Sequence, residues 1–439
     1  MGLEASATIG ASNRQKIVRR GSHDILQGGW LSIPSRENLE ASYNESFSFE
    51  NDIQVKYSGF PLVRDMMLSE ATRTAALESD GYKQMSYTKS TDGWFRTLFV
   101  FEGRAMDRTG WALAIVTLNA IVWTVMAENF LPESNRDALE PYENFFSLVL
   151  STTLAFLLVF RLNRSNIQFW ISRERWGSIV ALGRSITSGV TTHGSHDMNS
   201  CYNVIRWMSA FVIATMYFLR GIKKLIPETF AGILTKGEVE TLQKARHPPI
   251  YAADLTRMYL HELFEISEST PVSVAQFRAQ QLIFIEQQLN SLMNDLGAME
   301  RIKATPLPLV YVTHLRTWLM LFLLSMPFVW QPSLHYATIP VVFMTSFAML
   351  GLEGAAQEME APFTKDRTNH LNMDAYCLLM LSNIQQQITD DANRKKKASA
   401  IATLNFETSK HMRDLIERPP PPDENNFEDS FASIETLDC

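Results

Sequence analysis

The chain has 439 residues, with 47 acidic and 40 basic side chains and a formal net charge of −7. The acidic excess is concentrated between Asp423 and Asp438, which argues against nucleic acid as a partner because phosphate binding needs a basic surface. Three widely spaced cysteines, Cys201, Cys377 and Cys439, give no basis for a disulfide framework or a zinc site.

The N-terminal region, residues 1–90, is polar and shows no sustained helical or strand period. It is predicted to be a loosely ordered arm. It lacks the basic-then-apolar layout of a secretory signal. Gly2 and Ser6 fit the pattern M-G-x-x-x-[ST], but this short pattern also occurs in many unmodified proteins, so myristoylation of Gly2 stays open.

Four apolar stretches are long enough to predict membrane-spanning helices. The predicted spans are residues 111–130, 142–160, 308–330 and 336–357. Pro141 suits the first turn of the second span because it has no amide hydrogen to leave unpaired. The third and fourth spans are separated by only a few residues and should form an antiparallel pair.

A further apolar segment, Tyr202–Leu219, contains Arg206 and could be either a fifth span or the buried core helix of a soluble domain. Loop charges help to decide, because Lys and Arg near span ends favour the cytosolic side. Basic residues flank one end of every span, whereas the loops 131–140 and 331–335 carry almost no basic excess. We therefore expect four spans, both termini on the inner side, and residues 163–305 as an internal helical domain.

The C-terminal region, residues 386–439, is polar and contains the run Pro419–Pro422. Its acidic tail is predicted to be disordered. Between this region and the N-terminal arm, residues 91–385 form the predicted membrane-containing domain.

No enzyme signature is visible in the sequence. The segment HELFE begins with His261 and Glu262, but Glu265 stands where the zinc-protease motif needs a second histidine. Nucleophile-elbow, Walker and dinucleotide-binding glycine patterns are also lacking from the sequence. We therefore expect neither catalysis nor a bound metal.

The second span carries Thr152, Phe156 and Phe160 at spacings of four, which places them on one helix face. In a symmetric ring of subunits such a face would repeat around the axis. The periodicity alone fits lipid-facing or packed phenylalanines equally well.

The sequence FRLNRSN follows directly, so a continuous helix would leave the membrane carrying polar side chains. These are Arg161, Asn163, Arg164 and Asn166. They could line a wet, electropositive vestibule that concentrates anions, or serve as ordinary basic anchoring at the inner membrane surface.

Three carboxylates, Glu353, Glu358 and Glu360, follow closely on the fourth apolar run. A charge so near the hydrocarbon region is costly unless it is paired, so a structural ion-pair role is favoured over ion sensing. The candidate partners are Arg173, Arg175 and Arg301.

Three segments together resemble the bestrophin family, in particular its bacterial, fungal and plant branch. They are LLVFRLNRSNIQFWISRERWGSIV (157–180), ERIKATPLPLVYVTHLRTWL (300–319) and LEGAAQEMEAPFTKDRTNHLNMD (352–374). In the first segment Gln168 replaces an arginine of the family pattern. The resemblance covers roughly residues 95–385.

The resemblance implies an all-α integral membrane protein with four spans per subunit and a helical cytosolic domain. It implies a homopentamer that conducts chloride, and also bicarbonate, through a central pore. On this reading the segment 202–219 is a buried cytosolic helix. The family's pore neck falls on Thr152, Phe156 and Phe160, and Thr152 departs from the usual aliphatic residue, which should make the outer neck easier to wet. The family's cytosolic aperture falls on Gln280 or Ile283.

Animal bestrophins hold calcium with a run of acidic residues. Here the corresponding stretch, Thr364–Thr368, has two basic residues and one acid, so no calcium clasp and no other cofactor are expected. The implied partners are membrane lipids, chloride or bicarbonate ions and further copies of the chain. The sequence leaves open whether the membrane is a thylakoid or a plasma membrane. A secondary anion transporter and a non-conducting membrane scaffold are the alternatives to a channel.

Overall fold

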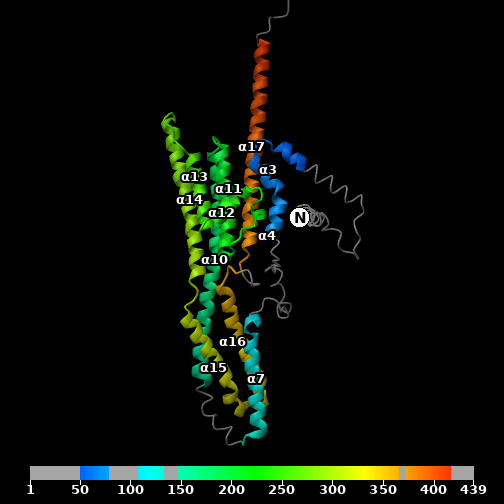
Figure 1. Ribbon diagram of the computed structural model, residues 1–439, viewed down its shortest axis with the longest axis vertical. Coiled ribbons are helices and arrows are strands. Elements are labelled where there is room, and N and C mark those ends of the chain that lie inside the picture. Colours follow the sequence, from blue (N-terminus) through cyan, green and yellow to red (C-terminus); the bar gives the residue numbers. More distant parts are fainter. Residues whose placement is uncertain (1–49, 79–105, 133–145, 365–370, 417–439) are drawn as a thin grey trace, which may run out of the picture. The chain divides into compact units, whose positions relative to one another are not determined.

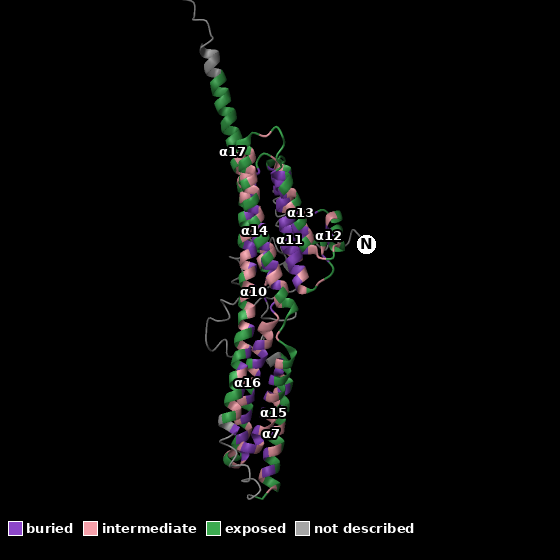
Figure 2. Cartoon of the chain, turned by 90° about the vertical axis from the view of Figure 1, so that its left-hand side faces the viewer, coloured by how far each residue is buried: buried purple, intermediate pink, exposed green. Residues whose placement is uncertain are grey.

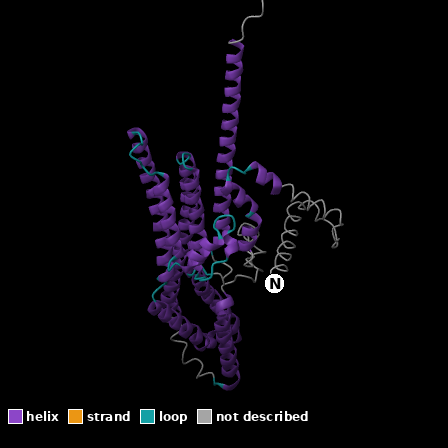
Figure 3. Ribbon diagram, turned by 45° about the horizontal axis from the view of Figure 1, so that its top comes forward, coloured by secondary structure: helices purple, strands orange, loops and turns teal. Residues whose placement is uncertain are grey.

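The computed structural model describes residues 50–78, 106–132, 146–364 and 371–416. These ranges consist of helices and connecting loops and contain no strand, which confirms the predicted all-α class (Figure 3). The chain forms two compact units, residues 1–387 and 388–439. The candidate site lies in the first unit.

The apolar helices of the first unit pack against one another (Figure 1). They are α7 (Met106–Phe130), the upstream part of α10 (Ser151–His193), α15 (Leu309–Leu334) and α16 (Thr338–Glu360), with a π-helical turn, Phe146–Leu150, preceding α10. The described stretches Arg108–Phe130 and Leu309–Glu360 are long and apolar enough to cross a membrane, and the second of them contains both α15 and α16. Residues 142–145, the predicted start of the second span, lie outside the described residues.

The apolar core of this region comes from all four helices. α7 packs on α16 and α15, and α10 packs on α16. Buried residues, purple in Figure 2, occur along each of these helices. The core includes Val116, Ala120, Leu154, Leu158, Leu319, Leu323, Met326, Val342 and Leu350. Large apolar side chains such as Trp111, Leu118 and Met344 are exposed instead, as expected for helices whose outer surface meets lipid.

Helix α15 continues through Pro327 to Leu334, beyond the predicted end of the third span at residue 330. Proline lacks an amide hydrogen and disturbs the hydrogen bonds of the preceding turn. Beside this turn, Nδ2 of Asn119 on α7 donates a hydrogen bond to the carbonyl oxygen of Leu324 at 3.0 Å. The polar side chain of Asn119 thus holds α7 against the disturbed turn.

The helical domain contains α11 (Met198–Arg220), α12 (Lys236–Lys244), α13 (Pro248–Leu263) and α14 (Val272–Ala304). α11 is almost wholly buried and packs on α10, α13 and α14, which confirms that the segment 202–219 is a core helix. Asp197 caps its start by accepting hydrogen bonds from the amides of Asn199 and Ser200. Gly221 ends it in the left-handed conformation, with φ at 72°.

Part of the predicted N-terminal arm is folded, which corrects the prediction of a loosely ordered arm for residues 50–78. α3 (Pro61–Leu68) buries Leu62, Val63 and Met66, and α4 (Glu70–Glu78) follows it. Arg73 of α4 is buried, and its Nη1 donates to the carbonyl oxygen of Ala231 at 2.9 Å. Burial lowers the pKa of Arg73. Residues 1–49, which include Gly2, and residues 79–90 lie outside the described ranges.

The long helix α17 (Met373–Ile416) begins in the first unit and continues into the second. At its start Asp374 accepts from Nη1 of the buried Arg220 at 2.7 Å. In the second unit Lys395 pairs with Asp391 at 2.6 Å. Residues 417–439, which contain the predicted acidic tail, lie outside the described residues.

Gly232 tests whether the folded N-terminal helices depend on their contact with the helical domain. Its φ is 73°, and a Cβ there would collide with the carbonyl oxygen of Asp65 in α3. The substitution Gly232→Ala should therefore lower the free energy of unfolding by about 1–3 kcal/mol. It should also speed tryptic cleavage within residues 50–78.

Gly237→Ala is the matched control, because nothing lies within 4 Å of a Cβ at that helical position. It should leave cleavage unchanged and stabilise the protein by up to about 1 kcal/mol. Equal melting temperatures and cleavage rates for the two variants would contradict the proposed contact.

Candidate functional site

One face of the 43-residue helix α10 carries exposed residues from Thr152 to Ser188, with an interruption between Glu174 and Ala181 where the residues are half-buried or buried. Among the apolar side chains, Phe156 is 63% and Phe160 is 54% exposed, and their rings meet edge to face with centroids 4.6 Å apart. The exposed face includes Thr152, Phe156, Val159, Phe160, Asn163, Ile167, Trp170, Glu174, Ala181 and Ser188. The three predicted neck residues therefore lie on this face, which continues from the apolar into the polar part of the helix.

The opposite face of α10 is buried against the neighbouring helices. It carries Leu154, Leu158, Arg161, Ser165, Ser172 and Trp176. Successive residues of a helix are rotated by about 100°, so Arg161 points away from the exposed face although it directly follows Phe160. Helix rotation thus separates a predicted neck residue from the adjacent residue in the predicted vestibule.

Arg161 is enclosed by carboxylates of α16. Its side chain is fully buried, with Nε 2.6 Å from Oε2 of Glu353 and Nη2 3.2 Å from Oε2 of Glu360. The prediction that Arg161 lines an open vestibule is therefore wrong. A buried guanidinium needs paired carboxylates, and it has them here.

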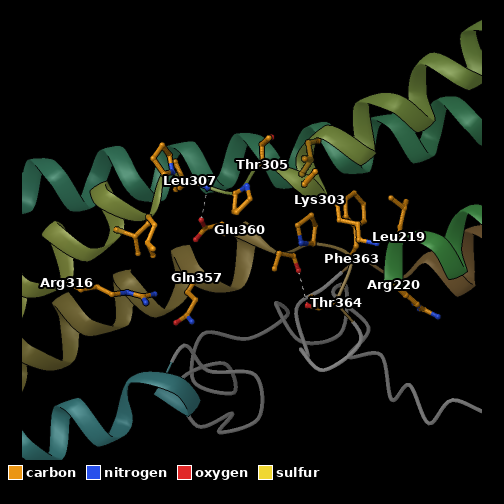
Figure 4. A pocket seen from close by; sticks show the side chains of 18 residues that line it. Leu219, Arg220, Lys303, Thr305, Leu307, Arg316, Gln357, Glu360, Phe363 and Thr364 are labelled. Carbon is orange, nitrogen blue, oxygen red and sulfur yellow. Dashed lines mark hydrogen bonds between the residues drawn. The ribbon is translucent and has the colours of Figure 1, made fainter. Parts of the chain in front are cut away.

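The same carboxylates bind further groups on other helices. Nε of Arg316, on α15, lies 2.6 Å from Oε1 of Glu353. Oε1 of Glu360 accepts a hydrogen bond from the amide of Leu307 at 3.2 Å, drawn in Figure 4. Arg108, on α7, lies 3.5 Å from Glu358. The acidic cluster of Glu353, Glu358 and Glu360 thus joins all four apolar helices, in the structural role that was predicted.

The predicted partners of these carboxylates were wrong. Arg175 pairs with Asp295 at 3.0 Å, and the Arg173 guanidinium lies 4.5 Å from the ring centroid of Tyr376. Arg301 is exposed on the last turn of α14. The arginines that pair with these carboxylates are distant from them in sequence. The only indication of this pairing in the sequence was that these arginines lie near the ends of the predicted spans.

Tyr311 is a residue that sequence reasoning did not single out for a role. Its hydroxyl donates to the carbonyl oxygen of Leu157 on α10 at 3.0 Å. This bond ties the start of α15 to α10 within one turn of Phe160. Together with Arg161, Tyr311 fixes the rotation of α10.

The remaining predicted residues are accessible to different degrees. Asn163 and Arg164 are exposed, and Asn166 is half-buried. On α14, Gln280 and Ile283 are both exposed, whereas Ile285 and Leu289 bury the other side of that helix. The described geometry is compatible with either aperture residue, so their role stays a prediction.

Among the described residues no group of three or more His, Cys, Asp or Glu side chains could hold a metal ion. Residues 365–370, which cover most of the stretch compared with the calcium clasp, lie outside those ranges. The absence of a calcium clasp stays a prediction.

Comparison with known proteins identifies the family. Residues 85–386 match the family described as "Bacterial/Fungal Bestrophin protein". The chain belongs to the bestrophin family. The family match begins after α3 and α4, so these N-terminal helices lie outside the common bestrophin region.

Curated bestrophin relatives are channel proteins by name. A voltage-dependent anion channel-forming protein of Nostoc is 30% identical over 295 residues, covering 66% of this chain and 90% of the relative. The chloroplastic voltage-dependent chloride channel 1 of Arabidopsis thaliana is 22% identical, covering 69% of this chain and 68% of the relative.

The fold agrees with that of a solved bestrophin. A bacterial bestrophin homologue from Klebsiella pneumoniae superimposes with a TM-score of 0.55 at 22% identity, covering 63% of this chain and 97% of that structure. The membership of this family and the described apolar helices make the chain an integral membrane protein.

Glu353 is the carboxylate on which the buried network should depend most. Replacing it by glutamine leaves Arg161 with only Glu360 and deprives Arg316 of its partner. We expect Glu353→Gln to lower the free energy of unfolding by about 3–5 kcal/mol, because a buried charge loses its counter-charge. The melting temperature of the purified protein in detergent measures the effect.

Glu358→Gln serves as the control, since its partner Arg108 is 41% exposed and the contact is longer. Its cost should stay below about 1 kcal/mol. A melting temperature for Glu353→Gln as high as that of Glu358→Gln would show that the buried network is not needed for stability.

Proposed function

We propose that several copies of this chain surround a central pore lined by the exposed face of α10, and that the pore conducts small monovalent anions. The observation that carries the proposal is the continuity of this face from Phe156 through Asn163 to Trp170 and beyond. Lipid contact would account for exposed phenylalanines in the membrane, but it would not account for the same helix face staying exposed in the helical domain.

Membership of the bestrophin family supports the proposed number of copies and the proposed ion. Five copies around one axis would bring Thr152, Phe156 and Phe160 together as three successive rings, one turn apart. Chloride, and bicarbonate of the same charge, are the proposed ions. The names of the relatives as anion and chloride channels support this choice.

Anion selectivity would come from the charge pattern of the exposed face. No carboxylate occurs on α10 before Glu174, whereas Arg164 is exposed one turn beyond Phe160. Arg161 contributes little free charge because Glu353 and Glu360 neutralise it. Arg164, with the amides of Asn163 and Asn166, would therefore supply the positive potential that concentrates anions at the inner mouth.

The neck would act as an apolar barrier that ions can cross when it is hydrated and that closes when it dewets. Phenylalanine rings present positive edges to a passing anion while excluding bulk water. The hydroxyl of Thr152 would support water at the outer ring, so the barrier would be shorter than one made of three apolar rings. Gln280 or Ile283 would form a second constriction in the cytosolic part of the pore.

The neck assignment is tested by truncating both aromatic rings. Phe156→Ala with Phe160→Ala should raise single-channel chloride conductance at least about twofold and weaken discrimination among anions, because the apolar constriction widens. Planar-bilayer recording of the purified protein measures both quantities.

The control is the same pair of truncations on α16, where Phe343 and Phe347 are also exposed and stack at 6.3 Å. Phe343→Ala with Phe347→Ala should leave conductance unchanged. If both double variants conduct like the wild type, α10 does not form the neck.

Thr152 provides a test in the opposite direction. Thr152→Ile replaces a ring of hydroxyls with apolar groups and lengthens the dry segment, so conductance should fall. Thr153→Ile is a neighbouring control, since the Thr153 hydroxyl already donates to the carbonyl oxygen of Val149. A fall for Thr153→Ile but not for Thr152→Ile would place the wrong threonine in the pore.

The alternatives to a channel give different results in reconstituted membranes. A secondary transporter would show flux that saturates and depends on a proton or sodium gradient. A non-conducting scaffold would show no flux at all.

A further inference from the structure

A second cavity, separate from α10's exposed face, lies at the end of the helical domain. It has a volume of about 390 Å³ and is formed by the end of α11, the loop after it, the link between α12 and α13, and the last turn of α14. Three charged side chains line it, Lys223, Arg246 and Lys303, and all three are cationic. No carboxylate belongs to the described lining.

The acid nearest in sequence to Lys303 is already engaged. Oε1 of Glu300 lies 2.7 Å from Nε2 of His247. Lys223 and Arg246 are exposed, and neither forms an ion pair among the residues that the structure describes. The positive charge of the cavity is therefore only partly compensated by the protein.

Lys303 is held in place at the cavity wall. Its Nζ donates to the carbonyl oxygen of Phe218 at 2.6 Å and lies 4.9 Å from the Phe218 ring centroid. Desolvation lowers the pKa of Lys303, although Glu300 opposes the shift. An anion entering the cavity would favour the charged ammonium and offset this desolvation.

The cavity lies close to the membrane-spanning helices. Lys303 precedes the first residue of α15, Leu309, by six positions. It also lines a neighbouring cavity of about 710 Å³ that reaches Glu360 and Arg316, and Figure 4 shows Lys303 near Leu219 and Phe363 there. Both a lipid headgroup and a soluble anion from the inner side could thus reach this end of the domain.

We propose that Lys223, Arg246 and Lys303 form a binding site for a phosphate group. Three cationic side chains lining one cavity suit a multiply charged phosphate better than a single chloride, because the attraction grows with the charge of the ligand. Arg246 offers a planar fork of donors that matches phosphate oxygens, and the two lysines add point charges. The site does not require α10 to form a pore, so it can be tested without measuring current.

The experiment uses the full chain in nanodiscs of phosphatidylcholine. In one arm, pyrophosphate and inorganic phosphate are titrated from solution and followed by calorimetry. In the other arm, phosphatidic acid is added to the nanodiscs, and lipid retention is followed by native mass spectrometry. Saturable binding in the first arm identifies a soluble ligand, and selective retention in the second identifies a lipid headgroup.

The test variant is Lys223→Gln with Arg246→Gln, and both side chains are exposed, so the fold should be kept. The control, Arg184→Gln with Lys236→Gln, removes the same charge from exposed positions that do not line the cavity. Affinity should fall at least about tenfold in the test variant and stay unchanged in the control. Equal affinity in the two variants, or no binding in either arm, would overturn the proposal.

Discussion

The burial of Arg161 is the constraint on which the arrangement of the membrane helices depends. A guanidinium without solvent must be surrounded by carboxylates, and Glu353 and Glu360 of α16 meet this requirement at 2.6 and 3.2 Å. Arg316 of α15 shares Glu353, so the pair is part of a network rather than an isolated bridge. These charges lie where the apolar helices meet the helical domain, and they bind α10 to α15 and α16.

The network also determines which residues of α10 can meet an ion. With Arg161 held inward, and Tyr311 bonded to the carbonyl oxygen of Leu157, the rotation of the helix is fixed. Phe156 and Phe160 must then point outward, as must Asn163 one turn later. Arg161, next to the proposed neck, thus orients the side chains of the neck, whereas the exposed Arg164 can attract anions.

Local patterns in the sequence predicted much of the fold but not the partners of its charges. Apolar windows located α7, α15 and α16 to within a few residues, and buried neighbours confirmed α11 as a core helix. The role of Arg161 was missed because it depends on the rotation of the helix and on carboxylates about 190 positions away. The sequence did show that Arg161 is rotated by about 100° from Phe160 around the helix axis. The folding of α3 was missed because its contacts are tertiary, yet Pro61 at its first turn and the spacing of Leu62 and Met66 were a usable signal.

We propose that this bestrophin conducts anions through a pore lined by α10. The most direct measurement is the reversal potential of the purified wild-type protein in planar bilayers, under a potassium chloride gradient and after replacement of chloride by gluconate. We predict currents that reverse close to the chloride equilibrium potential and shrink when gluconate replaces chloride. Currents that reverse at the potassium equilibrium potential, or bilayers that stay silent, would exclude an anion-conducting pore.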